Sequence, residues 1–312
     1  MYGMGFVSGR IGRTRSWIRG VLAIATCCLA TGAVGACTST LDFDKTKEGG
    51  DGGNTPKPDS GKADTGGGGD DDDAGGRFCD SLDTEPTFCD DFDGEGLGSL
   101  WDDLEQTNGA VSTDTITAKS APGALLSKSS QLVDDKEGVR AVAKKAFASF
   151  AGKPVTMKFD FDVNIEKFDE VVTQGQTRLV TPFALLFGTA GDYVEIVLNF
   201  VSNGTGVVAQ VVESGENPDG GKPYGSHGPF SARPKLKDWT HVRLEFDIHN
   251  PAGTGNLVRV FIDGKSQFEG SLTVPLKAAT PRLELGIGWA QVPAAAWTIR
   301  YDNFVADLRL LQ

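Results

Sequence analysis

Three polar side chains share the spacing of one face of a β-strand and could together bind a sugar. Tyr193, Glu195 and Asn199 are separated by even numbers of residues, and side chains two residues apart along a strand point to the same side. An aromatic ring can stack on the apolar face of a sugar, while a carboxylate and an amide can hydrogen-bond to its hydroxyl groups. The alternating residues are apolar and are predicted to face the core: Val194, Ile196, Leu198 and Phe200.

Further candidate ligand contacts lie outside that strand. Residues 217–230 are predicted to form a long polar loop that contains Tyr224 and His227, and long loops in compact domains are often functional. Arg243 is one of several outward charges in a later strand. For both segments a structural role is the alternative, because loops also simply connect strands and outward charges usually form a solvated face.

Motifs of several well-known chemistries are absent. The sequence contains no nucleophile elbow, no HExxH zinc motif and no phosphate-binding loop. Its formal net charge is −12, and no basic patch with interleaved aromatic residues occurs, so nucleic acid is not an expected partner.

The N-terminal residues 1–36 have the organisation of a signal peptide. Four arginines precede an uncharged stretch from Gly20 to Val34, which is short for a membrane-spanning helix. The small residues before Cys37 resemble the lipobox of bacterial lipoproteins, which implies that Cys37 is lipidated and begins the mature protein. Thr38 follows in place of the aspartate of inner-membrane retention, so we expect anchoring at the outer membrane or cell surface. Ordinary secretion with a chance cysteine is the alternative.

Residues 37–77 are predicted to form a disordered tether. This segment is rich in glycine and aspartate and has few large apolar residues, so it cannot bury enough apolar surface to fold. A flexible chain of about 40 residues spans on the order of 35 Å. We interpret the acidic run at 70–73 as a solvated spacer because it lacks the ligand spacing of an EF-hand.

Cys79 and Cys89 are predicted to form a disulfide. Two cysteines this close in an exported chain usually pair, and closing so short a loop contributes about 2.5–3 kcal/mol in the chain-entropy model. Metal binding by two cysteines without a nearby histidine is the weaker alternative.

The remaining residues, 78–312, are predicted to be one all-β domain. Alternation of apolar and polar residues is typical of strands at 157–163 and 242–248, and Asp263-Gly264 predicts a hairpin turn after 258–262. Further strands are expected at about 180–188, 193–201, 206–213, 282–289 and 297–309, while 139–150 fits either a strand or a helix. Many antiparallel strands in one domain favour a two-sheet sandwich or jelly roll.

Four segments resemble the concanavalin A-like lectin/glucanase domains, including laminin G-like members. They are Phe88–Gly94 followed by Trp101, then Ser120–Leu125, Lys237–Val242 and Tyr301–Phe304. The resemblance implies a jelly roll with neighbouring termini and a concave face that binds glycans or proteins. It also implies a structural calcium ion between the first and closing strands, for which Asp302 and Asp93 are the candidate ligands. The alternative is that Asp302 hydrogen-bonds the backbone.

The catalytic signatures of enzymes in that superfamily are missing. Family 16 glycoside hydrolases carry E-x-D-x-x-E on one strand, whereas Asp192 and Glu195 fall on opposite faces here. Alginate lyases of this fold carry Gln-x-His, and none of His227, His241 and His249 follows that pattern. The tryptophans Trp239, Trp289 and Trp297 are in phase with buried residues and are predicted to pack in the core.

These observations favour a lipid-anchored surface protein whose jelly-roll domain binds carbohydrate or another extracellular polymer. A polysaccharide-cleaving enzyme, hydrolase or lyase, with an unrecognised site is the alternative. A structural or adhesive envelope protein is the third interpretation.

Overall fold

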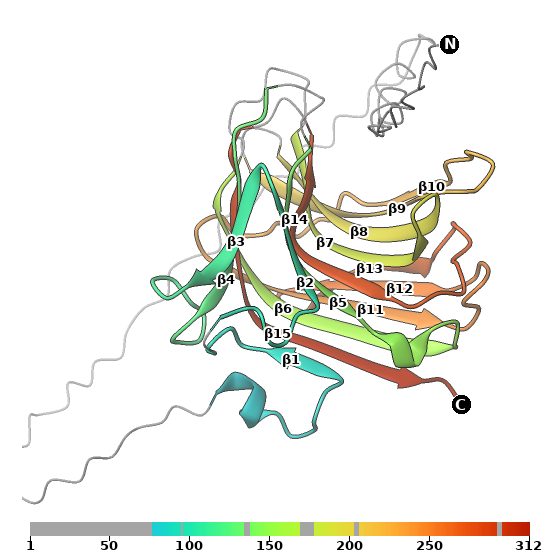
Figure 1. The fold of residues 1–312 in the computed structure, drawn as a ribbon, viewed down its shortest axis with the longest axis horizontal. Helices are drawn as coiled ribbons and strands as arrows, with labels where there is room; N and C mark the ends of the chain where they lie inside the picture. The colour runs from blue at the N-terminus through green and yellow to red at the C-terminus, as the bar shows by residue number, and fades with distance from the viewer. Residues whose placement is uncertain (1–76, 95, 134–137, 169–177, 203–205, 292–294) are drawn as a thin grey trace, which may run out of the picture. The chain divides into compact units, whose positions relative to one another are not determined.

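The domain is an antiparallel two-sheet sandwich (Figure 1). The computed structural model describes residues 77–94, 96–133, 138–168, 178–202, 206–291 and 295–312. The predicted signal peptide, Cys37 and nearly all of the predicted tether therefore lie outside the described residues. Within the described part, no helix is long and apolar enough to cross a membrane.

Sheet A contains eight strands, among them the first and the last strand of the described domain. Its order is β13 (Lys265–Ser271), β12 (Leu257–Ile262), β11 (Trp239–Ile248), β6 (Val155–Lys167), β15 (Thr298–Leu310), β4 (Ala124–Ser129) and β3 (Gly109–Asp114), and β1 (Phe88–Asp90) also pairs with β15. The pairing of β1 with β15 brings the two ends of the domain together, as the family resemblance implied.

Sheet B packs against sheet A and carries the predicted polar strand. Its order is β10 (Tyr224–His227), β9 (Val207–Glu216), β8 (Asp192–Ser202), β7 (Arg178–Thr189), β14 (Arg282–Ala290), β5 (Arg140–Ala146) and β2 (Asp103–Thr107). Short 3₁₀ helices cover Phe78–Ser81 and Ala148–Phe150. The ambiguous segment at 139–150 is thus mainly a strand, and the predicted loop at 217–230 was wrong in part because it contains β10.

The last two strands in chain order join parts of the domain that are distant in sequence. Strand β14 lies between β7 and β5 in sheet B, and β15 lies between β6 and β4 in sheet A. Among the early strands, β2 pairs with β5 and β3 pairs with β4. These two pairs are therefore joined to the rest of each sheet through β14 and β15 respectively.

The core forms where the inward faces of both sheets meet. Phe159 of β6 is completely buried and lies with its ring centroid 5.3 Å from that of Phe183 and 6.0 Å from that of Phe246. The contact with Phe183 joins sheet A to sheet B, the contact with Phe246 lies within sheet A, and both add to the free energy gained from apolar burial. The predicted two-sheet sandwich is confirmed.

The predicted disulfide is also confirmed. Cys79 and Cys89 are bonded and connect the first 3₁₀ helix to β1. Next to this bond, the buried ring of Trp101 packs on Phe88 and donates its Nε1 proton to Asp90 at 2.7 Å. Disulfides form and persist in oxidising compartments, so the bond agrees with export.

Two of the three tryptophan predictions were wrong. Trp297 is fully buried as predicted. Trp289 is 40% exposed, because a register shift in β14 between Leu285 and Trp289 turns it to the outer side of sheet B. Trp239 is half-buried and alternates with the inward Thr240, so its side chain lies on the outer side of sheet A.

Candidate functional site

The outer face of sheet B, the side turned away from the core, brings three predicted residues together. Tyr193, Glu195 and Asn199 lie on this side of β8, because the alternating residues of β8 belong to the main core. Asn199 accepts a hydrogen bond from Thr181 of β7 at 2.6 Å. The spacing of the polar residues along β8 was therefore a correct guide to a shared face.

The neighbouring strands add side chains to the same face. Ser214 of β9 lies opposite Glu195 and donates its hydroxyl to Glu195 Oε1 at 2.7 Å. Tyr224 of β10 lies opposite Ser214, and its side chain is 55% exposed. Residues directly opposite in an antiparallel pair point to the same side, so Tyr224 belongs to the face that contains Glu195.

Two residues that the sequence analysis missed complete the centre of the face. Glu284 of β14 has a largely buried side chain, and Arg140 of β5 donates to it with 2.5 Å between Nη2 and Oε1. Arg140 also donates to Glu105 of β2 at 3.1 Å and to the carbonyl oxygen of Gly288 at 3.1 Å. Glu284 alternates with the apolar Leu283 and Leu285, and this alternation was the available signal.

Glu195 and Glu284 lie near each other across β7. Glu284 is opposite Ala184, and Glu195 is opposite Leu186 two residues further along. Two strand spacings and two residue steps place their Cα atoms about 12 Å apart. Ala184 and Leu186 of β7 lie between them, and each carboxyl group is bonded on the side away from β7, Glu195 to Ser214 of β9 and Glu284 to Arg140 of β5.

The two glutamates differ in their surroundings. Burial raises the pKa of Glu195, the Ser214 hydroxyl lowers it, the Glu284 carboxylate raises it and the Arg140 guanidinium lowers it, with a net rise. Glu284 instead has a guanidinium as its direct partner. Glu195 is thus favoured to hold a proton, while the carboxylate of Glu284 is paired with the Arg140 guanidinium.

An apolar floor and exposed aromatic residues surround these charges. Ala184, Val197 and Val212 form a buried cluster separate from the main core, with Leu186 packed against it. Trp289 and Tyr224 are both exposed, on β14 and β10. A partly apolar surface with a few convergent polar groups is typical of ligand sites.

Tyr193 is placed on the face but is poorly suited to accept a proton. Burial, together with the negative charges of Glu195 and Glu216, raises the pKa of its hydroxyl group to about 12. A catalytic base works best when its pKa is near the working pH, so Tyr193 fits a binding role.

The other two predicted ligand contacts lie elsewhere. His227 faces the opposite side of β10, where its ring nitrogen Nε2 is 2.6 Å from the fully buried Glu213. Arg243 lies on the outer side of sheet A and donates to Asp160 at 2.6 Å. His227 is thus hydrogen-bonded to a buried carboxyl group and Arg243 forms an ion pair with Asp160.

Asp302 and Asp93 hold a loop through hydrogen bonds. Asp302 accepts hydrogen bonds from the backbone N–H groups of Lys119, Ser120 and Asn303, and Asp93 accepts one from Gly123 at 2.8 Å. This is the hydrogen-bonding role given above as the alternative to calcium. Among the described residues, no group of three or more His, Cys, Asp or Glu side chains is arranged to hold a metal ion.

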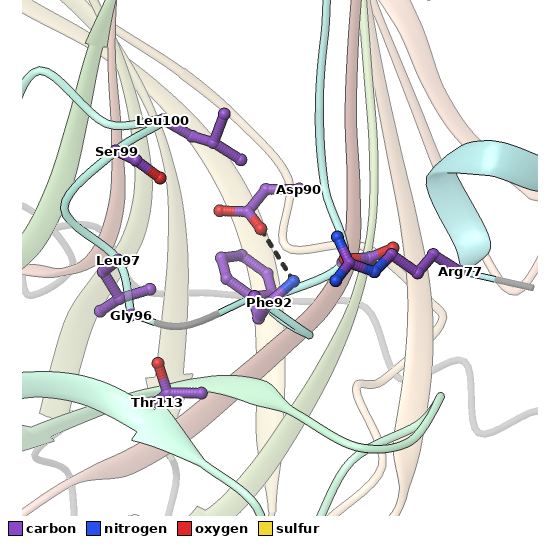
Figure 2. A pocket seen from close by; sticks show the side chains of 10 residues that line it. Arg77, Asp90, Phe92, Gly96, Leu97, Ser99, Leu100 and Thr113 are labelled. Atoms are coloured by element: carbon purple, nitrogen blue, oxygen red, sulfur yellow. Dashed lines mark hydrogen bonds between the residues drawn. The ribbon is translucent and has the colours of Figure 1, made fainter. Parts of the chain in front are cut away.

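A small pocket beside β1 is also structural in character (Figure 2). It has a volume of about 70 Å³ and is lined by Asp90, Phe92, Leu97 and Thr113 among others. Both carboxylate oxygens of Asp90 are in use, one by the Phe92 N–H group at 2.8 Å and the other by Trp101. The pocket has room for little more than water.

Comparisons with known proteins identify the fold. No model of a known protein family matches the chain, and no curated protein sequence matches it. An endo-β-1,4-glucuronan lyase from the fungus Trichoderma reesei is similar in structure, with a TM-score of 0.52, 12% identity and coverage of 71% of this chain and 95% of that chain. An alginate lyase is similar with a TM-score of 0.50, 12% identity and coverage of 72% and 98%. At these identities the likeness shows the fold, which is the predicted concanavalin A-like jelly roll.

Proposed function

We propose that the protein cleaves an extracellular polysaccharide by hydrolysis on the outer face of sheet B. The observation that carries this proposal is the pair of neighbouring glutamates in unlike surroundings. Glu195 has a raised pKa and a hydroxyl partner, whereas Glu284 is paired with Arg140. Pairs of carboxyl groups whose environments separate their proton affinities are typical of acid and base roles in one site.

The roles follow from these environments. Glu195 acts as the general acid and protonates the oxygen of the leaving sugar, because its raised pKa keeps a proton available closer to neutral pH. Glu284 attacks the anomeric carbon as the glycosidic C–O bond breaks, and water, deprotonated by Glu195, then hydrolyses the glycosyl–Glu284 bond and restores both glutamates. Glycosidases in which a carboxylate attacks the sugar hold the two groups about 5–5.5 Å apart, so cleavage requires both side chains to turn toward β7 from Cα atoms about 12 Å apart.

Arg140 positions Glu284 in this scheme. The guanidinium of Arg140 also donates to Glu105 and to the carbonyl oxygen of Gly288, and these two bonds fix it in place beside the Glu284 carboxylate. Trp289 and Tyr224 supply exposed rings that can stack on sugar units of a bound chain.

Hydrolysis is favoured over elimination by two features of the face. The similar structures are named as lyases of glucuronan and alginate, which are polymers of acidic sugars. Here the tyrosine of β8 has a pKa of about 12, and Glu284 and Glu216 carry the negative charges that would repel a carboxylate at the reacting sugar. We therefore propose a substrate that is uncharged where it is cleaved.

Binding without cleavage is the second candidate function. It is favoured by the Glu284–Arg140 contact at 2.5 Å, since a carboxylate held in an ion pair can serve stability alone. Trp289 and Tyr224 then bind the polymer with no chemistry between them.

One experiment separates these functions. The chain is incubated with neutral β-glucans, xylan and mannan and with alginate and polyglucuronate, and reducing ends and unsaturated uronides are measured. New reducing ends without unsaturation, reduced at least about 100-fold by Glu195→Gln and by Glu284→Gln, support hydrolysis. Glu245→Gln on the outer side of sheet A is the matched control and should retain activity.

Each other outcome argues against hydrolysis. Unsaturated products identify a lyase. Polymer binding without product, retained in Glu195→Gln and lost in Trp289→Ala, identifies a binding protein. Neither binding nor cleavage of any of these polymers contradicts both candidate functions.

We also propose that the domain is anchored at the cell surface through lipid on Cys37. The proposal is supported by the small residues before this cysteine and by the glycine- and aspartate-rich sequence after it. An anchored domain on a long tether would meet extracellular polymers, which agrees with the proposed activity.

A further inference from the structure

A second polar pocket lies on the outer side of sheet A. It has a volume of about 540 Å³, and its walls are formed by β6, β15 and two loops. Its lining residues are Thr117, Asn164, Glu166, Lys167, Lys237 and Arg300. The Glu195–Glu284 site is on sheet B, so this pocket belongs to a different sheet.

Asn164 gives the pocket an unused hydrogen-bond acceptor. The residue is 5% exposed, and its Oδ1 atom has no hydrogen-bond partner among the described residues. Asp160 and Asp162, which precede it on the same face of β6, are both paired, with Arg243 and Asn303 respectively. A buried carbonyl oxygen without a donor costs free energy, and Asn164 lines the pocket, so a ligand hydroxyl that reaches Oδ1 would recover that cost.

The charge of the pocket favours an anionic ligand. Arg300 is already bonded to Asp114 and Glu166. Lys167 and Lys237 are exposed and line the same pocket. Lys237 is held in place by its backbone, because its N–H group donates to the Ile165 carbonyl oxygen at 2.9 Å.

A tryptophan lies beside the unused acceptor. Trp239 of β11 is the direct partner of Asn164 in the sheet, and its side chain is half-buried on the outer side. Trp239 is not itself part of the pocket lining, but it follows the lining residue Lys237 by two positions, and an aromatic ring there can stack on a sugar.

We propose that this pocket binds a carboxylate-bearing sugar unit, separately from cleavage. A hydroxyl group of the sugar donates to Asn164 Oδ1, and the carboxylate of the sugar accepts from the ammonium groups of Lys167 and Lys237. The sugar ring lies against the side chain of Trp239. The protein therefore recognises acidic units of a polymer on sheet A, while sheet B acts where the polymer is uncharged. The binding site stands on its own residues and does not depend on the proposed hydrolysis.

Direct binding measurements test this proposal. The full mature chain is titrated with an oligoglucuronate, with a neutral gluco-oligosaccharide of equal length and with free glucuronate. We expect the oligoglucuronate to bind more tightly than the neutral oligosaccharide, with an affinity that falls as salt is added. Free glucuronate should bind weakly at the same site, which a competition titration shows.

Variants locate the binding. Lys167→Ala combined with Lys237→Ala should weaken oligoglucuronate binding by about tenfold or more, since hydrogen bonds to charged groups are lost. Asn164→Asp keeps the size of the side chain and should also weaken binding, because it adds a negative charge. The exposed Lys265→Ala is the matched control, and Glu195→Gln should bind as the wild type does.

Three outcomes would overturn the inference. They are equal affinity for the neutral and acidic oligosaccharides, unchanged affinity in the double lysine variant, and loss of binding in Glu195→Gln. Failure of the hydrolysis assay would leave the binding result unaffected, so the two proposals fail separately.

Discussion

Replacing Arg140 with methionine tests whether one ion pair holds the proposed cleavage site together. Arg140 and Glu284 have side chains that are 30% and 10% exposed, so their contact is shielded from most of the solvent. Methionine keeps much of the apolar stem of arginine and removes the guanidinium. The carboxylate of Glu284 then stays in a largely buried position without its cation.

The structure sets the expected magnitude. A hydrogen bond to a charged partner contributes about 1.5–3 kcal/mol, while the more exposed contact to Glu105 contributes less than about 1 kcal/mol. We expect Arg140→Met to lower the free energy of unfolding by about 3 kcal/mol, because removing one partner of a shielded pair leaves a buried charge. Glu284→Gln removes that charge, so Arg140→Met should cost about 1.5 kcal/mol less when it is added to Glu284→Gln.

Urea denaturation of the wild type, the two single variants and the double variant measures this coupling. Arg309→Met removes an exposed ion pair with Asp307 and should change stability by less than about 0.5 kcal/mol. A coupling energy within about 0.5 kcal/mol of zero would show that Arg140 does not position Glu284, and the assignment of roles in the site would be wrong.

Four further predictions concern other parts of the chain. His241 has a pKa raised to about 9 by its hydrogen bonds to Asp160 and Asp162, so its contribution to the free energy of unfolding is fully present below about pH 6.5 and is lost toward pH 9. His241→Asn should therefore make the free energy of unfolding less dependent on pH in that range, and an unchanged pH dependence would refute the assignment. Asp160 has a pKa lowered to about 2, despite burial, by its bonds to His241, Arg243 and Lys158, so its own contribution is lost as the pH falls from about 4 to 2. Cys79→Ser with Cys89→Ser should lower the free energy of unfolding by about 2.5–3 kcal/mol in urea, and a change below about 1 kcal/mol would show that the loop stays ordered in the unfolded chain. Cys37→Ala should move the protein from the detergent phase to the aqueous phase, and unchanged partitioning would exclude the lipid anchor.

The sequence was sufficient to predict most of the strands after Val155 and most of their faces, because burial on one side imposes a period of two, but it missed β2, β3 and β10. It therefore placed Tyr193, Glu195 and Asn199 together on β8. It could not place Glu284 near Glu195, since their contact depends on β14 pairing with β7, nearly a hundred residues away. Strand order of this kind is decided by tertiary packing and leaves no local pattern.

The error at Trp289 has a specific cause. Leu283, Leu285 and Ile287 face the core, and strict alternation would put Trp289 beside them. The shift in register after Leu285 breaks the alternation. Gly286 has φ of 121° there, and a Cβ atom would lie 2.3 Å from the Ala141 carbonyl oxygen, so only glycine fits. Irregularities of this kind redirect side chains in ways that periodicity does not reveal.

The insertion of β14 and β15 between earlier strands has a consequence for how the protein reaches its final location. Neither sheet can be completed until the chain beyond Arg282 is available, and β1 must wait for a partner more than two hundred residues away, as the pairing of Phe88 with Ala306 shows. Pairings between such distant segments form slowly. For the export proposed above, a chain emerging from a translocation pore would therefore stay unfolded until its final strands arrive. The folded domain would form only after passage is nearly complete, on the side where its disulfide is stable.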